Sequence, residues 1–488
     1  MKVLFIGSCP LPAESGLPAQ GPGIRTWQLV KPAMNAGHIC LALCLRTEGV
    51  YPKDMEDEAR REIQPGLTFI NMSHKAFTNP DRIRALALDF KPDAIVGCAS
   101  VLPGFTASLI RDLAPFWADC FGDPVTEIQA KAEMYGREGC GEELFGVWRY
   151  YRAILAGADR FSTLSDAQNH ALAGQLALLG RLGYENAGYC LIRTIPCAVE
   201  GPPPIRESAP EFTLRGKAFP QDAFVVCFSG SYNTWMDVDL LFSGLEEAMN
   251  RVPRLVFLST GGGTKGYNEK LYNDFLKKVE ASPHRERFIM SGWVPFHEVP
   301  RYYAEANIGI NVDRFTYEGV LGSRNRIIQF LAHGLPVMTT ALSEISKSLA
   351  EKRMVHIFRM SGAEGETGVA ETLPELLERL SAHPGALAET GRLAQKHVLA
   401  EYNYERTTRP LMEWLEAPER SPDNIFRAQV APAPGEPVYL NPIEHAMDIE
   451  GMEGQIEYLL SEKRHLDKIR GTLAYRFLKL IKRMLFPS

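Results

Sequence analysis

Several features are scarce in this chain of 488 residues, and each scarcity excludes a class of protein. No run approaches the roughly 18–20 apolar residues that span a bilayer, so a protein integral to the membrane is not predicted. Lys and Arg number 53 against 59 Asp and Glu, and this net charge of −6 gives no reason to expect nucleic acid as a partner. The remaining composition, 45% apolar and 23% charged, predicts a soluble globular protein.

Cysteine occurs nine times, and its placement favours a reduced, cytoplasmic setting. The number is odd, and no Cys-x-x-Cys pair or Cys/His cluster has metal-ligand spacing. Several cysteines, such as Cys40, Cys44 and Cys227, lie in strand-like apolar runs. We therefore predict neither a disulfide framework nor a metal site. Residues 1–7 are too few for a signal-peptide core and predict a first β-strand.

Two glycine motifs of common nucleotide-binding enzymes are also missing. Gly-x-Gly-x-x-Gly does not follow the first predicted strand, which argues against a nicotinamide dehydrogenase. The glycine-rich segment 259–266 lacks the P-loop pattern, which argues against a P-loop NTPase. That segment either lines a cleft or forms a flexible loop.

Strand-like runs alternate with helical patterns along most of the chain. One series covers residues 1–195 and a second covers 196–417, with a proline-rich connection at 192–204. Alternating strands and helices predict parallel sheets with helices on both faces. The predicted fold class is α/β, with two tandem doubly wound, Rossmann-like domains that face a cleft.

Residues 418–488 differ in composition from both domains. Repeated proline without apolar periodicity predicts a linker at 419–442. Apolar residues at 449–466 have 3-4-3 spacing over about two heptads, which fits a docking helix or oligomerisation of the chain through a short coiled coil. Residues 468–488 hold six Lys or Arg and no acid, interleaved with apolar residues. This pattern predicts an amphipathic helix on the inner face of an anionic cytoplasmic membrane, or a helix packed on protein.

The most informative stretch is 318–337, which predicts a loop, a helix and a buried strand. The helix is expected to begin near Arg324. A helix N-terminus attracts phosphate through its free N–H groups and partial positive charge. Two arginines add full charge there, and an amide follows one turn later. The predicted binding residues of this stretch are Gly322, Ser323, Arg324, Arg326 and Gln329.

Arg326 and the Phe-Leu-Ala-His-Gly-Leu-Pro-Val sequence at 330–337 resemble the donor-binding region of family-4-like (group 1) glycosyltransferases of the GT-B fold. The resemblance implies a nucleotide-sugar donor in the second domain, a glycan or lipid-linked acceptor in the first, and no metal or other cofactor. It also implies a retaining hexosyltransferase and, with the basic tail, a role in cell-surface polysaccharide assembly. The family has an acidic residue for the ribose hydroxyls where this chain has Gln329, which hydrogen-bonds without charge.

Two acidic residues become candidate catalytic groups through the same resemblance. Glu318 is similar to the first glutamate of the family's paired-acid motif, which contacts the donor sugar, although ten residues rather than seven separate it from Gln329. Asp119 lies where similar enzymes place an acid or histidine facing the acceptor, and it is expected to orient or deprotonate a hydroxyl. The alternatives are an exposed loop acid for Glu318 and turn or capping chemistry for Asp119. Asp123 and Glu127 are weaker candidates.

Other donor contacts are implied at three loops. Gly23 lets the backbone approach the ligand between the domains, or is an ordinary loop glycine. Gly230 and Ser231 offer backbone N–H groups to phosphate, where the family carries an arginine and a lysine that this chain lacks. Trp293 and Val294 frame the base, unless the tryptophan is a core residue. Two rival functions remain: a nucleotide-sugar epimerase of the same fold, and a non-catalytic GT-B-like scaffold.

Overall fold

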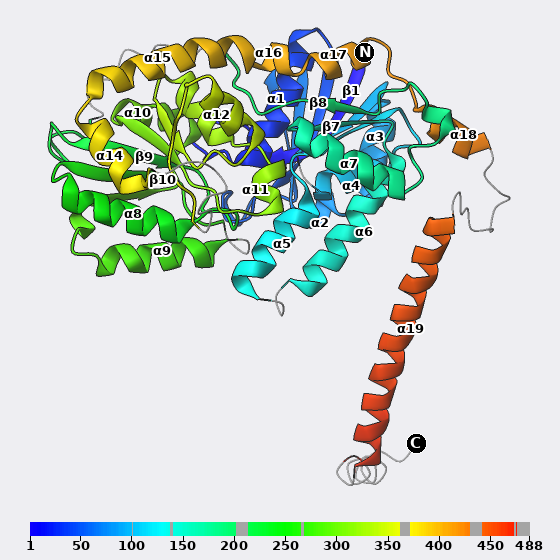
Figure 1. Cartoon of the computed structure of the whole chain (residues 1–488). Coiled ribbons are helices and arrows are strands. Elements are labelled where there is room, and N and C mark those ends of the chain that lie inside the picture. Colours follow the sequence, from blue (N-terminus) through cyan, green and yellow to red (C-terminus); the bar gives the residue numbers. More distant parts are fainter. Residues whose placement is uncertain are drawn as a thin grey trace.

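The computed structural model describes residues 1–99, 101–136, 140–201, 213–264, 268–361, 371–429, 442–472 and 475. Figure 1 shows two α/β domains side by side and a long C-terminal helix. Each domain holds one sheet covered by helices on both faces. The predicted fold class, two Rossmann-like domains facing a cleft with a helical extension, is therefore confirmed.

The first domain is built on an eight-stranded sheet with the order β3-β4-β2-β1-β5-β6-β7-β8. All neighbours are parallel except β3 and β4. The strands are β1 (Lys2–Cys9), β2 (Ile39–Arg46), β3 (Glu58–Gln64), β4 (Leu67–Met72), β5 (Ala94–Gly97), β6 (Phe116–Asp119), β7 (Arg160–Thr163) and β8 (Ile192–Thr194). The helices are α1 (Gly21–Asn35), α2 (His74–Phe77), α3 (Pro80–Phe90), α4 (Val101–Ser108), α5 (Pro124–Tyr135), α6 (Gly141–Gly157) and α7 (Asp166–Leu178).

The second domain is built on a six-stranded parallel sheet with the order β11-β10-β9-β12-β13-β14. Its central strands are continuous apolar runs because both faces of a parallel sheet are covered. The strands are β9 (Phe224–Ser229), β10 (Leu255–Thr260), β11 (Phe288–Gly292), β12 (Ile308–Asn311), β13 (Val337–Thr339) and β14 (His356–Ile357). The helices are α8 (Val238–Arg251), α9 (Glu269–Ala281), α10 (Val299–Ala304), α11 (Tyr317–Leu321), α12 (Asn325–Ala332), α13 (Glu344–Glu351), α14 (Leu373–Ser381) and α15 (Pro384–Glu401).

After α15 the chain crosses back to the first domain. Helices α16 (Tyr404–Thr407) and α17 (Arg409–Glu416) continue the line of α15 over both domains (Figure 1). The ring centroid of Trp414 lies 5.5 Å from that of Trp117 in the first sheet. The predicted boundary at 417 therefore falls after a segment that packs on the first domain.

The predicted linker at 419–442 is wrong for its first part, because α18 (Pro422–Gln429) docks on the first domain. Asp423 pairs with the buried Arg181, and the Ser421 N–H donates to Asp159 at 3.0 Å. These anchors are ionic and polar, so a search for apolar periodicity does not detect them. Residues 430–441 lie outside the described part.

The last described helix is α19 (Pro442–Gly471), which stands apart from both domains in Figure 1. The described side chains at 456–471 are exposed, and oligomerisation through 449–466 stays a prediction. Most of the predicted membrane segment, residues 473–474 and 476–488, lies outside the described residues. Among the helices that are described, none has the length and apolarity to cross a membrane.

Candidate active site

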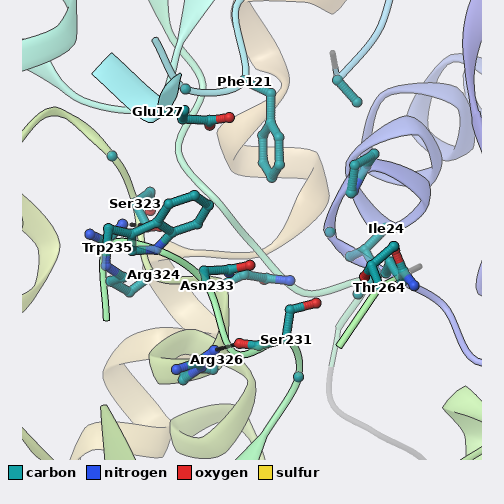
Figure 2. A pocket seen from close by; sticks show the side chains of 18 of the residues that line it. Ile24, Phe121, Glu127, Ser231, Asn233, Trp235, Thr264, Ser323, Arg324 and Arg326 are labelled. Atoms are coloured by element: carbon teal, nitrogen blue, oxygen red, sulfur yellow. Dashed lines mark hydrogen bonds between the residues drawn. The ribbon is translucent and has the colours of Figure 1, made fainter. Parts of the chain in front are cut away.

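A cavity of about 600 Å³ lies between the two domains, at the carboxyl ends of both sheets. Figure 2 shows Glu127 and Phe121 of the first domain on one side and Ser231, Asn233 and Arg326 of the second on the other. The predicted residues that line it are Asp119, Gly230, Ser231, Trp293, Val294, Glu318, Gly322, Ser323, Arg324, Arg326 and Gln329. Residues from distant parts of the sequence thus converge on one space.

Direct contacts close the domains around this cavity. Arg314 of the second domain reaches Glu133 on α5 at 2.7 Å and donates to the Ala130 carbonyl oxygen at 2.6 Å. On another side, the Ser165 hydroxyl donates to the Leu321 carbonyl oxygen at 2.9 Å. The second contact lies directly before the Gly322–Ser323 loop, so domain closure positions that loop.

Three glycines with positive φ angles allow the chain to turn at the ends of β9, β10 and β11, so that these loops approach one another closely. The glycines are Gly230 (+97°), Gly261 (+109°) and Gly292 (+66°). A Cβ at Gly261 would lie 2.2 Å from the Gly230 carbonyl oxygen, so only glycine fits there. The Gly230 N–H already donates to the Thr260 carbonyl oxygen at 2.9 Å. Ser231, one residue further, presents its hydroxyl to the cavity (Figure 2).

Arg324 is neutralised by two carboxylates of its own domain. Its Nε lies 2.7 Å from Asp313 Oδ1, and its terminal nitrogens lie 3.2 and 3.1 Å from the two Glu318 oxygens. Burial disfavours the charged guanidinium, but Asp313 and Glu318 outweigh this effect and raise the pKa of Arg324. Arg324 is therefore a structural cation, which organises the loop before α12 rather than offering an unpaired charge to a ligand.

Arg326 forms no ion pair with a carboxylate among the described residues. Its guanidinium donates to the Ser231 carbonyl oxygen at 2.9 Å and lies 4.1 Å from the centroid of the Phe228 ring. Burial lowers the pKa of Arg326 to about 10, against the opposing influence of Asp313, so the group is still charged at neutral pH. An unpaired cation in a buried setting is costly unless an anion joins it. Arg326 also lies in the first turn of α12, where anions are favoured.

The other predicted donor-binding residues line the same cavity as Arg326. Gln329 lies one turn further along α12 and lines the cavity. Trp293 and Val294 line it as well, and the indole N–H of Trp293 donates to the Gly263 carbonyl oxygen at 3.0 Å. This hydrogen bond fixes the ring at the wall. Trp293 is thus a cavity residue and not a core residue.

Glu318 is buried, not an exposed loop acid. Its carboxylate shares the single guanidinium of Arg324 with Asp313. Burial raises the pKa of Glu318 to about 7, with Asp313 acting in the same direction and Arg324 in the opposite one. One cation shared by two carboxylates offsets the cost of burying Glu318 only in part, so its pKa stays above the ordinary value although the ion pair forms.

Glu127, a weaker catalytic candidate in the sequence analysis, lies at the cavity. It lies in the first turn of α5, which Asp123 caps, and α5 packs against α11, the helix that holds Glu318. Its carboxyl points into the cavity (Figure 2), and no hydrogen bond reaches it from the described residues. Burial raises the pKa of Glu127 to about 8, and Glu318 and Asp123 act in the same direction. Two acids from different domains therefore face one space. The only local signal was an acid in the first turn of a helix that an aspartate caps.

Asp119 lies at the cavity, but its carboxylate is already occupied. Arg25 donates to both oxygens at 2.9 and 2.7 Å, the Ser162 hydroxyl donates at 2.7 Å and the Ala99 N–H at 3.3 Å. The two carboxylate oxygens thus accept four hydrogen bonds, two of them from one arginine, which leaves little capacity for a substrate hydroxyl. This geometry assigns Asp119 a positioning role at the ends of β6 and α1.

Gly23 does not line the cavity among the residues described. A Cβ there would lie 2.0 Å from the Pro10 carbonyl oxygen, so the glycine permits close packing of α1 on the loop after β1. The neighbouring Gly21 and Ile24 line the cavity instead. The close approach predicted at this glycine is thus to the protein's own backbone.

Comparison with known proteins agrees with this architecture. Residues 244–413 match the family model described as "Glycosyl transferase-like". Sucrose-phosphate synthase from Thermosynechococcus elongatus superposes with a TM-score of 0.64 at 16% identity, covering 88% of this chain and 100% of that one. A UDP-forming α,α-trehalose-phosphate synthase from Burkholderia vietnamiensis gives 0.60 at 10% identity, covering 86% and 98%. Anabaena HepE, in complex with UDP and glucose, gives 0.56 at 12% identity, covering 86% and 100%.

No curated protein sequence matches the chain significantly. The structural likeness defines the chain as a protein of the GT-B fold. Within that fold, the family match over 244–413 confirms the predicted resemblance to the group 1 glycosyltransferases.

Proposed function

We propose that this protein transfers a sugar from a nucleotide-sugar donor to an acceptor hydroxyl in the cleft and releases a nucleoside diphosphate. The observation that carries the proposal is Arg326, a cation in the first turn of α12 that donates to the Ser231 carbonyl oxygen and has no carboxylate partner among the described residues. A diphosphate supplies the anion that this arrangement lacks.

The rest of the nucleotide fits the neighbouring groups. Gln329, one turn along α12, is placed for ribose hydroxyls, and Trp293 with Val294 is placed for the base. The donor sugar then points from the diphosphate toward Glu318 and Glu127. Anabaena HepE was solved with UDP-glucose, so UDP-sugars are the first donors to test.

The protonation states along the cavity support a retaining transfer. Glu127 is largely protonated at neutral pH, Glu318 is held by Arg324, and Asp119 is held by Arg25. None of these three carboxyls is a free base. In the proposed step, the bond from the anomeric carbon to the phosphate oxygen breaks and a bond to the acceptor oxygen forms on the same face. The acceptor proton moves to the departing diphosphate, whose charge Arg326 stabilises.

The hexosyl donor, a glycan or lipid-linked acceptor, and a place in cell-surface polysaccharide assembly belong to the same proposal. An epimerase is less favoured because the cavity residues that the structure describes include no histidine to pair with an acid. A scaffold is less favoured because Arg326 replaces the positive charge that the loop after β9 lacks.

The test is to incubate the full chain with a panel of nucleotide-sugars and to identify the nucleotide products by mass spectrometry. Transferase activity predicts release of a nucleoside diphosphate, which slows in Arg326→Ala and persists in the surface control Arg285→Ala. Isomerised sugar on an intact nucleotide would support an epimerase. Donor binding without any release would support a scaffold.

A further inference from the structure

Helix α6 carries an apolar stripe that leads out of the cavity. Val147, Tyr151 and Ile154 line the cavity from one face of this helix. Leu144 precedes them at helical spacing, so it extends the same face by one turn. Its side chain is 39% exposed. The stripe therefore runs from the buried cavity wall to the surface, with Glu143 beside it in an ion pair with Lys131.

The outer end of α6 adds two large aromatic residues to this surface. Phe145 is 65% exposed and Trp148 is 44% exposed, and the exposed cation Arg149 lies beside them. Figure 1 shows α5 and α6 projecting together below the two domains. The tip of α5 is covered, since Tyr135 packs against the second domain's core, whereas the tip of α6 has no such cover among the described residues.

The acceptor side of the cavity is largely apolar as well. Its walls on α4, the loop after β6, and α5 carry the hydrocarbon and aromatic side chains of Val101, Leu102, Phe121 and Ile128, with the charged Glu127 and Lys131 beside them on α5. A free oligosaccharide carries hydroxyls that need hydrogen-bond partners when buried, and these walls offer few. A hydrocarbon chain gains free energy on the same surface.

We propose that the acceptor is an amphipathic lipid, and that α6 guides its hydrocarbon chain from the membrane into the cleft. The proposal rests on the proposed function and names its acceptor class. The hydroxyl-bearing head lies in the cavity, and the chain follows Val147 and Leu144 outward. Phe145 and Trp148 enter the membrane interface, where aromatic side chains are favoured, and Arg149 meets anionic headgroups.

The experiment measures contact between α6 and the bilayer in the full chain. Cys190 is the exposed cysteine, so Cys190→Ser gives a background in which Phe145→Cys accepts an environment-sensitive fluorophore. The matched control is Leu393→Cys, because Leu393 is 51% exposed and belongs to α15. Figure 1 shows α15 at the edge of the molecule opposite to α6. Both proteins are mixed with phosphatidylcholine–phosphatidylglycerol vesicles that carry quenchers on their acyl chains.

The proposal predicts that the fluorophore at 145 loses most of its emission while the one at 393 keeps it, even if the basic tail brings both proteins to the vesicle. Equal quenching at both positions, or none at 145, would overturn it. Absence of quenching with self-association through 145 would identify a second copy of the chain as the occupant. Calorimetry with UDP on the same proteins reports the donor site separately, so failure of the proposed function and failure of the lipid inference are distinguishable.

Discussion

Arg324 and Glu318 form a bidentate ion pair at the N-terminus of α12, with nitrogen–oxygen distances of 3.2 and 3.1 Å. This ion pair explains why Arg324 and Arg326, two residues apart, have different roles. Arg324 is bound to two acids of its own domain, whereas Arg326, two residues later, pairs with no carboxylate in the described part of the chain. The unpaired arginine is the proposed diphosphate contact.

Arg326→Ala should therefore weaken nucleoside diphosphate binding far more than nucleoside binding. A charge-assisted contact to phosphate contributes about 1.5–3 kcal/mol, so a loss of about 10- to 150-fold in diphosphate affinity is expected. Calorimetric titration with UDP and uridine measures both, with Arg285→Ala as the surface control. Equal losses for both ligands would remove the phosphate role.

Arg324→Ala should behave differently, because it leaves two buried carboxylates without their cation. Breaking such a buried pair costs about 3–5 kcal/mol of stability. Chemical denaturation should show this loss, whereas Arg326→Ala leaves no carboxylate unpaired and should be much less destabilised. Similar stability of the two variants would contradict the assignment of Arg324 as structural.

Glu127→Gln should change stability in a pH-dependent way. The folded-state pKa of about 8 lies above the ordinary glutamate value of 4.5, so the folded protein keeps a proton that the unfolded chain releases between these values. Wild-type stability therefore falls as pH rises through this window, and glutamine removes the loss. The Tm of the variant should match wild type near pH 4.5 and exceed it by about 2 °C at about pH 9. A Tm difference between variant and wild type that stays constant across this pH range would mean that the pKa of Glu127 is not raised.

Gln329→Glu should leave the fold intact because the side chain lines the cavity. A carboxylate makes stronger hydrogen bonds to ribose hydroxyls, so UDP should bind about fivefold more tightly. Dideoxyribose UDP, which lacks these hydroxyls, should show no gain in calorimetry. Unfolding of the variant would place the side chain in the core instead.

Deleting residues 468–488 should release the protein from anionic vesicles without changing its Tm. The segment contains six Lys or Arg, each worth about 1 kcal/mol near an anionic surface, so a loss of at least tenfold in vesicle affinity is expected. Sedimentation with vesicles at low and high salt measures the effect. Unchanged binding would assign the tail to contacts with protein.

The fold and the second-domain half of the site were predictable because their signals are local. Alternating apolar runs define both sheets, and the 322–329 stretch holds a loop, a helix start and its charges in continuous sequence. A local sequence pattern does not reveal an ion-pair partner that lies far away in the sequence and that folding brings close. Asp119 is 94 residues from Arg25, and their pairing occupies a carboxylate that was expected to orient or deprotonate an acceptor hydroxyl.

The same limit applies to Glu127 and α18. Glu127 acquires its raised pKa from burial and from Glu318 in the other domain, which no local pattern reveals. Asp423 anchors α18 through Arg181, so a polar segment docks without apolar periodicity. In each case the tertiary contact, and not the residue type, decides the role.

The most direct test of the account is a thermal-shift titration of the full chain with UDP, GDP, CDP and dTDP, alone and as nucleotide-sugars. A ligand that binds the native state raises the Tm, and at a fixed ligand concentration the shift grows with the logarithm of the affinity. We predict that one nucleotide series stabilises the protein and that Arg326→Ala abolishes most of this shift. No shift with any of the four series, or a shift that is unchanged in Arg326→Ala, would contradict a nucleotide-sugar site in this cleft.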